Sequence, residues 1–289
     1  MVLKPKGLSC DKIYSSEEKN GRFHKEVYQS AVKKQFTITS DFGYRLSCEM
    51  LEPAEVTPAQ ETSGRKLAGR KVAVLCHGFG GAKYACLIYA EIFLRLGFTV
   101  IIYDQRNHGL SGKSYTSMGY FERYDLKKII DWCYRKFGSD CRIVTHGESM
   151  GGATVLLHLE IDKRVRCVIA DCAYSDLTQL LKHQLRSYYH FPLFLVPVVS
   201  LLTYFRAGFR YNEVSPIQVV RQTDTPILFI HGKKDTYVPT QMSKDMYDCK
   251  RDKKAIYLVA QARHAGSCMV NRQGYEKRVG EFLETYFYR

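Results

Sequence analysis

The sequence predicts an α/β protein with a mostly parallel central sheet and helices on both faces. Short, continuously apolar segments recur from residue 71 onward, which is typical of strands buried on both sides. Segments with helical periodicity alternate with them. An alternation of strand and helix indicates parallel strands joined by helical crossovers that cover the sheet.

The residues before 71 add antiparallel strands at the N-terminal edge of this sheet. Apolar and polar residues alternate over 36–39, a turn sequence follows at 41–43, and every second residue from 44 to 50 is apolar. This is the pattern of an antiparallel hairpin. Residues 53–70 are rich in Pro, Ala, Thr, Ser and Gly without periodicity, so we expect an exposed connection.

The later strands and two helices follow from the same patterns. The predicted strands are 72–76, 98–103, 142–145, 165–170, 226–230 and 255–259. Apolar residues at three- and four-residue spacing predict helices over 126–137 and 275–286.

The crossover that leads to the strand at 226–230 is too long for one helix and its loops. We therefore divide the chain into an N-terminal extension, residues 1–35, a core made of residues 36–174 and 223–289, and an insertion, residues 175–222. The extension is polar and partly helical in pattern, and nothing in the sequence assigns it a role.

The net charge is high but not concentrated. Lys and Arg number 43 against 29 Asp and Glu, a formal net charge of +14, and the excess is spread over the whole length. A nucleic-acid-binding protein usually gathers its basic residues on one element. The densest basic run, residues 250–254, is interrupted by an acid, so we do not expect nucleic acid as a partner.

The cysteine pattern and the N-terminal residues predict a cytoplasmic protein. The ten cysteines include no C-x-x-C pair and several lie inside apolar runs, so we expect buried free thiols in a reducing compartment. Residues 1–6 have no apolar stretch behind their basic residues, so we expect no signal peptide. The longest apolar run, 191–202, is too short to span a membrane and holds two prolines.

A candidate nucleophile lies at Ser149. Residues 147–151 (GESMG) match the pattern G-x-S-x-G, which alone is a weak signal because glycine and serine are common. The context is stronger, since the motif follows the strand at 142–145 and precedes a helical run at 153–159. Such a turn exposes a serine hydroxyl at the top of a sheet, and glycines permit its sharpness. The alternative is a glycine-rich turn that holds a serine by chance.

A serine hydroxyl needs a base, and the base needs an acid that orients it. In a sheet of this kind both must follow later strands, in the order Ser, Asp, His. Asp235 follows the strand at 226–230, and His264 follows the strand at 255–259. We expect His264 to take the proton from Ser149 and Asp235 to fix the tautomer and orientation of His264.

Four other residues compete for these roles. His231, at the end of its strand, is an alternative base that we interpret as structural. Asp171 also follows a strand and is an alternative acid. Asp104 and His108 lie in a segment, 104–112, that we expect to be a loop held by hydrogen bonds rather than a catalytic element.

Acyl transfer also needs hydrogen-bond donors for the oxyanion. We expect one to be the backbone N–H of Met150, which follows Ser149 at the start of a helix. The second should come from the first strand-to-helix loop, 77–81 (HGFGG), whose glycines let the backbone turn its amides toward the site. There we expect the amide of Phe79, with Gly80 as the alternative.

Taken together, these motifs resemble the α/β-hydrolase superfamily. The resemblance rests on the segments 77–81, 104–112 and 147–152 together with Asp235 and His264, and it covers the chain from the predicted hairpin onward. Within the superfamily the chain is most similar to small bacterial serine carboxylesterases of the prolyl-oligopeptidase-like branch, a group that includes cinnamoyl and feruloyl esterases. The resemblance implies hydrolysis of an ester, thioester or amide without a cofactor, and a helical cap inserted after the strand that ends near residue 170.

The insertion also bears on what the site accepts. It is densely apolar and aromatic over 180–205, which favours a lid over an acyl or aromatic pocket. Alternatives are packing onto the core, a weak contact with a membrane surface, and a dimer contact. Lys182, Arg186, Arg206 and Arg210 flank the apolar run, where they would meet an anionic head group or solvate the outer face of the lid; we expect the second.

We expect a cytoplasmic serine hydrolase, specifically a carboxylesterase that acts on small to medium acyl or aryl esters, with no cofactor and no metal ion. The alternatives are a peptidase, thioesterase or acyltransferase with the same triad, and a noncatalytic binding protein on the same scaffold. The expected partner is a small-molecule ester, and the sequence does not decide the oligomeric state.

Overall fold

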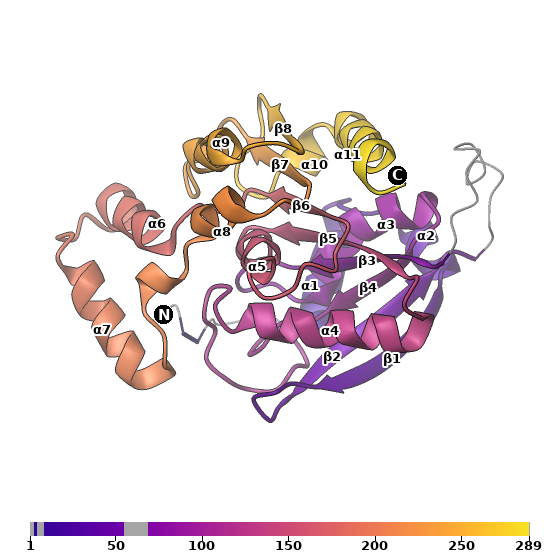
Figure 1. The fold of residues 1–289 in the computed structure, drawn as a ribbon, viewed down its shortest axis with the longest axis horizontal. Helices are drawn as coiled ribbons and strands as arrows, with labels where there is room; N and C mark the ends of the chain where they lie inside the picture. Colours follow the sequence, from indigo (N-terminus) through magenta and orange to yellow (C-terminus); the bar gives the residue numbers. More distant parts are fainter. Residues whose placement is uncertain (1–2, 5–8, 55–68, 289) are drawn as a thin grey trace.

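The residues described by the structure, a computed structural model, are 3–4, 9–54 and 69–288. The expected connection at 53–70 lies mostly outside these described residues. The described residues form an eight-stranded sheet with helices on both faces (Figure 1). The strands are β1 (Val32–Thr39), β2 (Arg45–Glu52), β3 (Lys71–Cys76), β4 (Thr99–Tyr103), β5 (Arg142–Glu148), β6 (Cys167–Asp171), β7 (Ile227–Gly232) and β8 (Lys254–Val259).

Helices fill the segments between these strands and precede the first of them. The α-helices are α1 (Cys10–Lys19), α2 (Lys25–Ser30), α3 (Leu87–Arg95), α4 (Glu122–Phe137), α5 (Met150–His158), α6 (Leu177–Gln184), α7 (Leu195–Ala207), α8 (Pro216–Gln222), α9 (Thr240–Cys249), α10 (Ser267–Val270) and α11 (Arg272–Tyr286). Three further turns of helix are η2 (Lys83–Cys86), η3 (Leu185–Tyr189) and η4 (Tyr211–Glu213).

The sheet has the predicted class and arrangement. Its strand order is β1-β2-β4-β3-β5-β6-β7-β8. Strand β2 pairs antiparallel with β1 and with β4, and all other neighbours pair parallel. The mostly parallel sheet with antiparallel strands at its N-terminal edge is therefore confirmed.

The hairpin begins earlier than the sequence pattern predicts. Strand β1 starts at Val32, whereas the alternation becomes visible only at residue 36. Since β1 is an edge strand whose first four residues are exposed, apolar side chains are not needed there and the pattern carries no signal. The last residues of the predicted N-terminal extension thus belong to the sheet.

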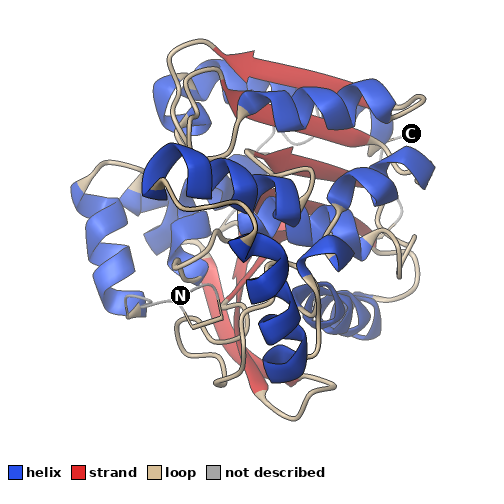
Figure 2. Cartoon of the chain, turned by 90° about the vertical axis from the view of Figure 1, so that its left-hand side faces the viewer, coloured by secondary structure: helices blue, strands red, loops and turns tan. Residues whose placement is uncertain are grey.

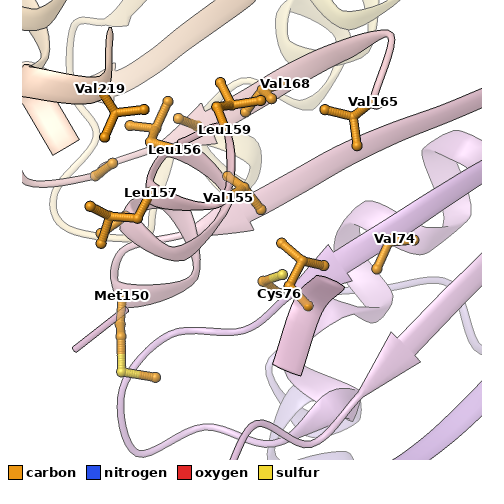
Figure 3. Close-up of a cluster of buried hydrophobic side chains, with 14 of the residues drawn as sticks. Val74, Cys76, Met150, Val155, Leu156, Leu157, Leu159, Val165, Val168 and Val219 are labelled. Carbon is orange, nitrogen blue, oxygen red and sulfur yellow. The ribbon is translucent and has the colours of Figure 1, made fainter. Parts of the chain in front are cut away.

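Alternate residues of each inner strand face two different helical layers. Val74 belongs to a buried cluster that includes residues of α4, α5, α8 and α9, while its neighbour Leu75 belongs to a second cluster that includes residues of α3 and α11. Helix α5 lies at the centre of the first layer, where Leu156 and Met150 are fully buried (Figure 3). Truncating a buried leucine in such a core costs about 2–5 kcal/mol of stability, so α5 is held firmly against the sheet.

The insertion between β6 and β7 is helical and extends beyond these layers. Helices α6 and α7 form the left-hand edge of the molecule in Figure 1, and Figure 2 looks onto that side. Helix α6 begins at Asp176, whose side chain accepts a hydrogen bond from the N–H of Gln179 at 3.0 Å. Helix α7 ends at Gly208, whose φ of 77° is the left-handed conformation that favours glycine after a helix.

Two further observations concern the cysteines and the helices. Nine of the ten cysteines are buried, and Cys249 is partly exposed. Within the described ranges, no helix combines the length and the apolarity needed to cross a membrane.

Candidate active site

Ser149 lies in the turn between β5 and α5. Its φ of 55° and ψ of −114° belong to a region that residues with a side chain rarely adopt, so the turn is strained. The N–H of Ser149 donates to the carbonyl oxygen of Asp171 at 2.8 Å, which ties the turn to β6. A Cβ at Gly147 would overlap the carbonyl oxygen of Gly151, so glycine allows the helix to start directly above the strand.

The structure brings His264 and Asp235 to this serine. Nε2 of His264 lies 3.0 Å from Oγ of Ser149, and Nδ1 of His264 lies 2.7 Å from Oδ2 of Asp235. Asp235 follows β7 and His264 follows β8, so parallel neighbours present both side chains at the same edge of the sheet as Ser149. With its proton on Nδ1, the imidazole donates to the carboxylate and keeps Nε2 free to accept from the serine hydroxyl.

Asp235 is held in its ionised form by several donors. Its Oδ1 accepts the backbone N–H groups of Tyr237 at 3.0 Å and Val238 at 2.9 Å. Its Oδ2 faces the ring nitrogens of His264 and His231. Burial favours the neutral acid, but the hydrogen bonds outweigh it and lower the pKa of Asp235 to about 2.

His231, the alternative base, contacts the same carboxylate oxygen of Asp235 as His264 does. Its Nε2 lies 3.1 Å from Oδ2 of Asp235 and 2.9 Å from the carbonyl oxygen of Val238, and its Nδ1 lies 2.7 Å from Oγ of Ser243. Both nitrogens are therefore engaged away from the serine. This agrees with a structural role for His231.

The electrostatic surroundings favour a protonated His264. Burial lowers the pKa of this imidazole, but the hydrogen bond and charge of Asp235, with smaller contributions from Glu148 and Asp171, outweigh burial and raise the pKa above 6.5. The ring of Tyr237 also lies against the imidazole, with centroids 5.1 Å apart. The imidazolium that forms when His264 accepts a proton is thus stabilised.

Asp171, the alternative acid, is fully buried and points elsewhere. Its Oδ2 accepts hydrogen bonds from the hydroxyl groups of Tyr275 at 3.1 Å and Tyr89 at 3.4 Å, and its Oδ1 has no partner among the described residues. Burial, followed by the charge of Glu148, raises the pKa of Asp171 to about 7. Of these two carboxylates, Asp235 is the one hydrogen-bonded to His264, so the geometry favours Asp235 as the acid.

The amides expected at the oxyanion site differ in what they contact. Met150 is the first residue of α5, so its N–H has no acceptor within the helix. The N–H of Gly80 donates to Nε2 of His108 at 3.1 Å, whereas no partner for the N–H of Phe79 exists within the part of the chain that is described. The geometry therefore favours Phe79 over Gly80 as a free donor.

The segment 104–112 is a hydrogen-bonded loop, in agreement with the sequence-based expectation. Oδ1 of Asp104 accepts the N–H of Lys83 at 2.7 Å, and its Oδ2 accepts the N–H of Leu110 at 3.0 Å. Nδ1 of His108 lies 2.8 Å from the carbonyl oxygen of Arg106, so Nε2 remains the acceptor for the neighbouring glycine-rich loop. Burial lowers the pKa of His108 and keeps the ring neutral.

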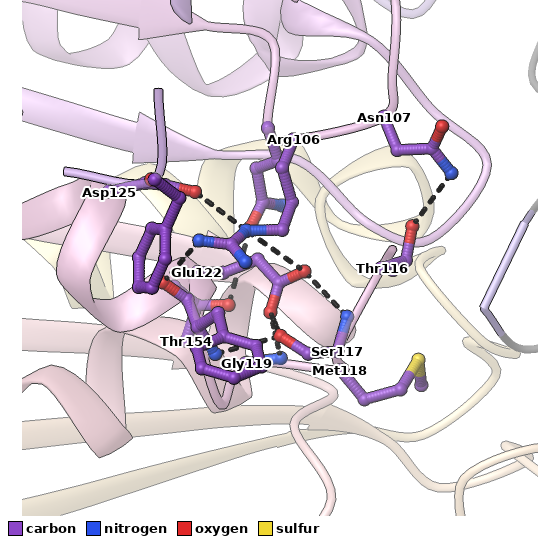
Figure 4. A network of polar contacts seen from close by, with 12 residues as sticks. Arg106, Asn107, Thr116, Ser117, Met118, Gly119, Glu122, Asp125 and Thr154 are labelled. Atoms are coloured by element: carbon purple, nitrogen blue, oxygen red, sulfur yellow. Dashed lines mark hydrogen bonds and ion pairs between the residues drawn. The ribbon is translucent and has the colours of Figure 1, made fainter. Parts of the chain in front are cut away.

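Near the start of this loop, Arg106 forms a buried ion pair with Asp125 (Figure 4). Its Nε donates to Oδ2 of Asp125 at 2.8 Å and lies 3.9 Å from Oε1 of Glu122. Glu122 in turn accepts the N–H groups of Ser117 and Gly119, each at 2.8 Å. Every charge in the cluster has a partner, as burial requires.

One group of potential metal ligands occurs within the described ranges, formed by Cys172, Asp235 and His264, whose ligand atoms lie within 4.8 Å of one another. Burial and nearby carboxylates raise the pKa of the Cys172 thiol well above its usual range, and a protonated thiol is a poor ligand. The imidazole and the carboxylate bind each other. The group therefore does not fit a metal ion.

Comparisons with known proteins bear on the family. The Bacillus subtilis protein YqkD is 34% identical to this chain over 288 residues, which cover 99% of this chain and 90% of YqkD. A family model described as alpha/beta hydrolase fold matches residues 72–198. The chain belongs to the α/β-hydrolase superfamily. A model of the serine hydrolase (FSH1) family matches residues 167–267.

Solved structures share the fold of this hydrolase. The Pyrococcus furiosus esterase Pf2001 superposes with a TM-score of 0.74 at 21% identity, covering 98% of this chain and 99% of the esterase. The acylaminoacyl peptidase of Pyrococcus horikoshii gives a TM-score of 0.62 at 16% identity, covering 88% of this chain and 41% of the peptidase. At these identities the similarity shows the fold alone.

Sequence reasoning missed several residues that shape the site of this hydrolase. The ring of Tyr237 against His264 and the electrostatic effect of Glu148 on the buried Asp171 have no sequence signal, because they depend on which segments converge. Arg22 is also unexpected, since it comes from the N-terminal extension and lies 3.5 Å from Oε2 of Glu148. The extension thus reaches the residue that precedes the candidate nucleophile.

Proposed function

We propose that Ser149, His264 and Asp235 are the catalytic triad of a carboxylesterase. The observation that supports this most directly is the continuous hydrogen-bonded chain from Oγ of the serine through the imidazole to the carboxylate. His264 takes the serine proton as Oγ attacks the ester carbonyl, and Asp235 stabilises the imidazolium. The strained backbone of Ser149 holds the hydroxyl at the sheet edge while this occurs.

The remaining steps use the same residues. The amides of Phe79 and Met150 donate to the oxyanion of the tetrahedral intermediate, each donor being worth about 3–4 kcal/mol in the transition state. The imidazolium of His264 then protonates the leaving alcohol, which leaves an acyl group on Ser149. A water molecule, deprotonated by His264, attacks the acyl-enzyme and releases the acid.

Contacts between the insertion and the candidate site support our assignment of the insertion as a cap. Residues of α6 and η3 contact the loop that carries Asp235: Nε2 of His183 lies 2.8 Å from the carbonyl oxygen of Thr236, and the hydroxyl of Tyr188 donates to Oγ1 of Thr236 at 2.8 Å. The apolar side chains of this cap suit small to medium acyl or aryl esters. We retain the cap, residues 175–222, and begin the core at residue 32, where β1 starts, so that the core is residues 32–174 and 223–289.

The names of structural relatives include an esterase and an acylaminoacyl peptidase. The same triad would serve a peptidase, thioesterase or acyltransferase, and the geometry of the three residues does not separate these reactions. We favour the esterase because the insertion next to the candidate site is densely apolar and aromatic, which suits an acyl or aryl group. The cysteines, nine of ten of them buried, suit a reducing compartment such as the cytoplasm.

The test is the replacement of Ser149. The variant Ser149→Ala should lower turnover of p-nitrophenyl esters by about 10⁴–10⁶ and abolish labelling by a fluorophosphonate probe, with an unchanged circular dichroism spectrum. Ser139→Ala, which changes an exposed serine after α4, is the matched control and should retain both activities. Hydrolysis at the parent rate by the Ser149 variant would contradict the proposal. Acyl chains from acetyl to palmitoyl, hydroxycinnamoyl esters, thioesters and aminoacyl amides, tested on the parent enzyme, identify the substrate class.

A further inference from the structure

Helix α7 carries an apolar stripe that faces away from the core. Side chains spaced by three and four residues share one face of a helix. On α7 and the residue before it, the members of this stripe are Phe194, Val198, Leu201, Leu202 and Phe205. Phe194, Leu202 and Phe205 are 67%, 61% and 77% exposed, which is unusual for side chains of this size.

The opposite face of α7 is fixed to the rest of the insertion. Val196 and Thr203 are its buried residues. Oγ1 of Thr203 is hydrogen-bonded to the hydroxyl of Tyr211 at 3.0 Å, and the N–H of Tyr211 donates to Oγ of Ser200 at 2.9 Å. These contacts set the rotation of the helix about its axis, so the apolar stripe is held outward. Packing of this stripe onto the core is therefore not what the structure shows.

The charged side chains of the segment that contains the stripe have one sign. Residues 177–212 contain Lys182, Arg186, Arg206 and Arg210 and no Asp or Glu. The arginines are exposed and Lys182 is partly exposed. The acids that flank the segment in sequence are used as helix caps: Asp176 accepts from Gln179, and Glu213 accepts the N–H of Arg210 at 2.6 Å.

We propose that α7 and the adjoining residues of the insertion dock on the surface of an anionic lipid bilayer. An apolar stripe with basic residues at its borders matches both parts of such a surface, because the apolar side chains enter the boundary between head groups and acyl chains while the cations meet the anionic head groups. This proposal differs from the expectation that the four cations only solvate the outer face, because exposed apolar side chains of α7 share that face.

A second copy of the chain fits this surface less well. A two-fold contact through α7 would gather the four cations of both copies at one interface, where like charges are unfavourable. An anionic bilayer has the opposite sign and no fixed shape to match. The turn η3, which precedes α7 in the insertion, is hydrogen-bonded to Thr236, next to Asp235.

The experiment measures sedimentation of the full chain with vesicles. With phosphatidylcholine vesicles that contain about 30 mol % phosphatidylglycerol the protein should co-sediment, with vesicles of phosphatidylcholine alone it should bind much less, and added salt should weaken binding. The double variant Leu202→Glu, Phe205→Glu places acids in the stripe at exposed positions and should lower the partition coefficient at least about tenfold. Val32→Glu, at an exposed apolar residue of β1, is the matched control and should bind like the parent.

Three outcomes would overturn the proposal: no co-sedimentation with anionic vesicles, equal binding by the parent and the double variant, or a dimer in light scattering that the double variant loses without any vesicle binding. The last outcome would assign the stripe to a second copy of the chain. Ser149→Ala should bind vesicles like the parent, so a failure of the proposed hydrolysis is distinguishable from a failure of the docking.

Discussion

Replacing Asp171 distinguishes a buried structural carboxyl from the carboxyl that orients His264. The pKa of Asp171 is raised from 3.8 to about 7, first by burial and then by the charge of Glu148. A carboxyl whose pKa is higher in the folded than in the unfolded chain binds more protons when folded, so it reduces stability as the pH rises. For this shift, the reduction from about pH 4 to about pH 8 amounts to about 4 kcal/mol.

The variant Asp171→Asn removes this titration while retaining an acceptor oxygen for Tyr275 and Tyr89. It adds a buried amide N–H₂, whose cost of about 1–3 kcal/mol does not depend on pH. We therefore predict that the free energy of unfolding of the variant, relative to the parent, increases by about 4 kcal/mol from about pH 4 to about pH 8. The constant cost cancels in this comparison.

The assay is urea unfolding, followed by circular dichroism, at a series of pH values. Asp245→Asn, at an exposed aspartate of α9, is the control and should parallel the parent across the range. Parallel profiles for Asp171→Asn and the parent would refute the assignment of a raised pKa. In ester hydrolysis Asp171→Asn should retain activity within about tenfold, whereas Asp235→Asn should lose about 10⁴ in kcat because the imidazole loses its orienting partner.

The remaining predictions concern the base and the two loops. The proposed base His264 can accept a proton only when neutral, and its pKa is raised above 6.5, so kcat/KM should fall as the pH drops through a midpoint above 6.5. In the variant Asp235→Asn, the midpoint of the residual activity should lie at a lower pH than in the parent. Arg106→Met leaves Asp125 without its buried partner and should cost about 3–5 kcal/mol in urea unfolding; a loss below about 1 kcal/mol would contradict it. His108→Ala frees the glycine-rich loop and should lower kcat up to about 100-fold with little change in KM; an unchanged kcat would count against its positioning role.

Much of the fold was predictable because its signals are local. Each buried parallel strand is an apolar run, and the turn at Ser149 is marked by glycines whose neighbours leave no room for a Cβ. The proximity of Asp235 and His264 to Ser149 was predictable, because each residue follows a strand of the sheet in a fixed chain order. The occupation of the Gly80 amide by His108 was not, since it depends on how two loops meet.

The sequence also did not predict which face of α7 is exposed. Its residues are as apolar as those of a core helix, so composition alone favours a lid or simple packing. The side of the helix that is held inward is determined by tertiary contacts, such as those of Thr203 and Ser200 with Tyr211, and not by composition. The hydrophobicity of this segment predicts that its apolar side chains contact another apolar surface. Tertiary contacts determine which way these side chains face.

The position of β8 at the edge of the sheet affects how the enzyme loses activity on heating. Strand β8 pairs with β7 alone, and most of its residues are only partly buried. Edge elements open locally at a lower free energy than the core, and such opening would carry His264 away from Ser149 while the inner strands stay paired. Activity should therefore disappear at a lower temperature than ellipticity. Amide hydrogens of β8 should exchange faster than those of β5, which directly precedes the proposed nucleophile Ser149.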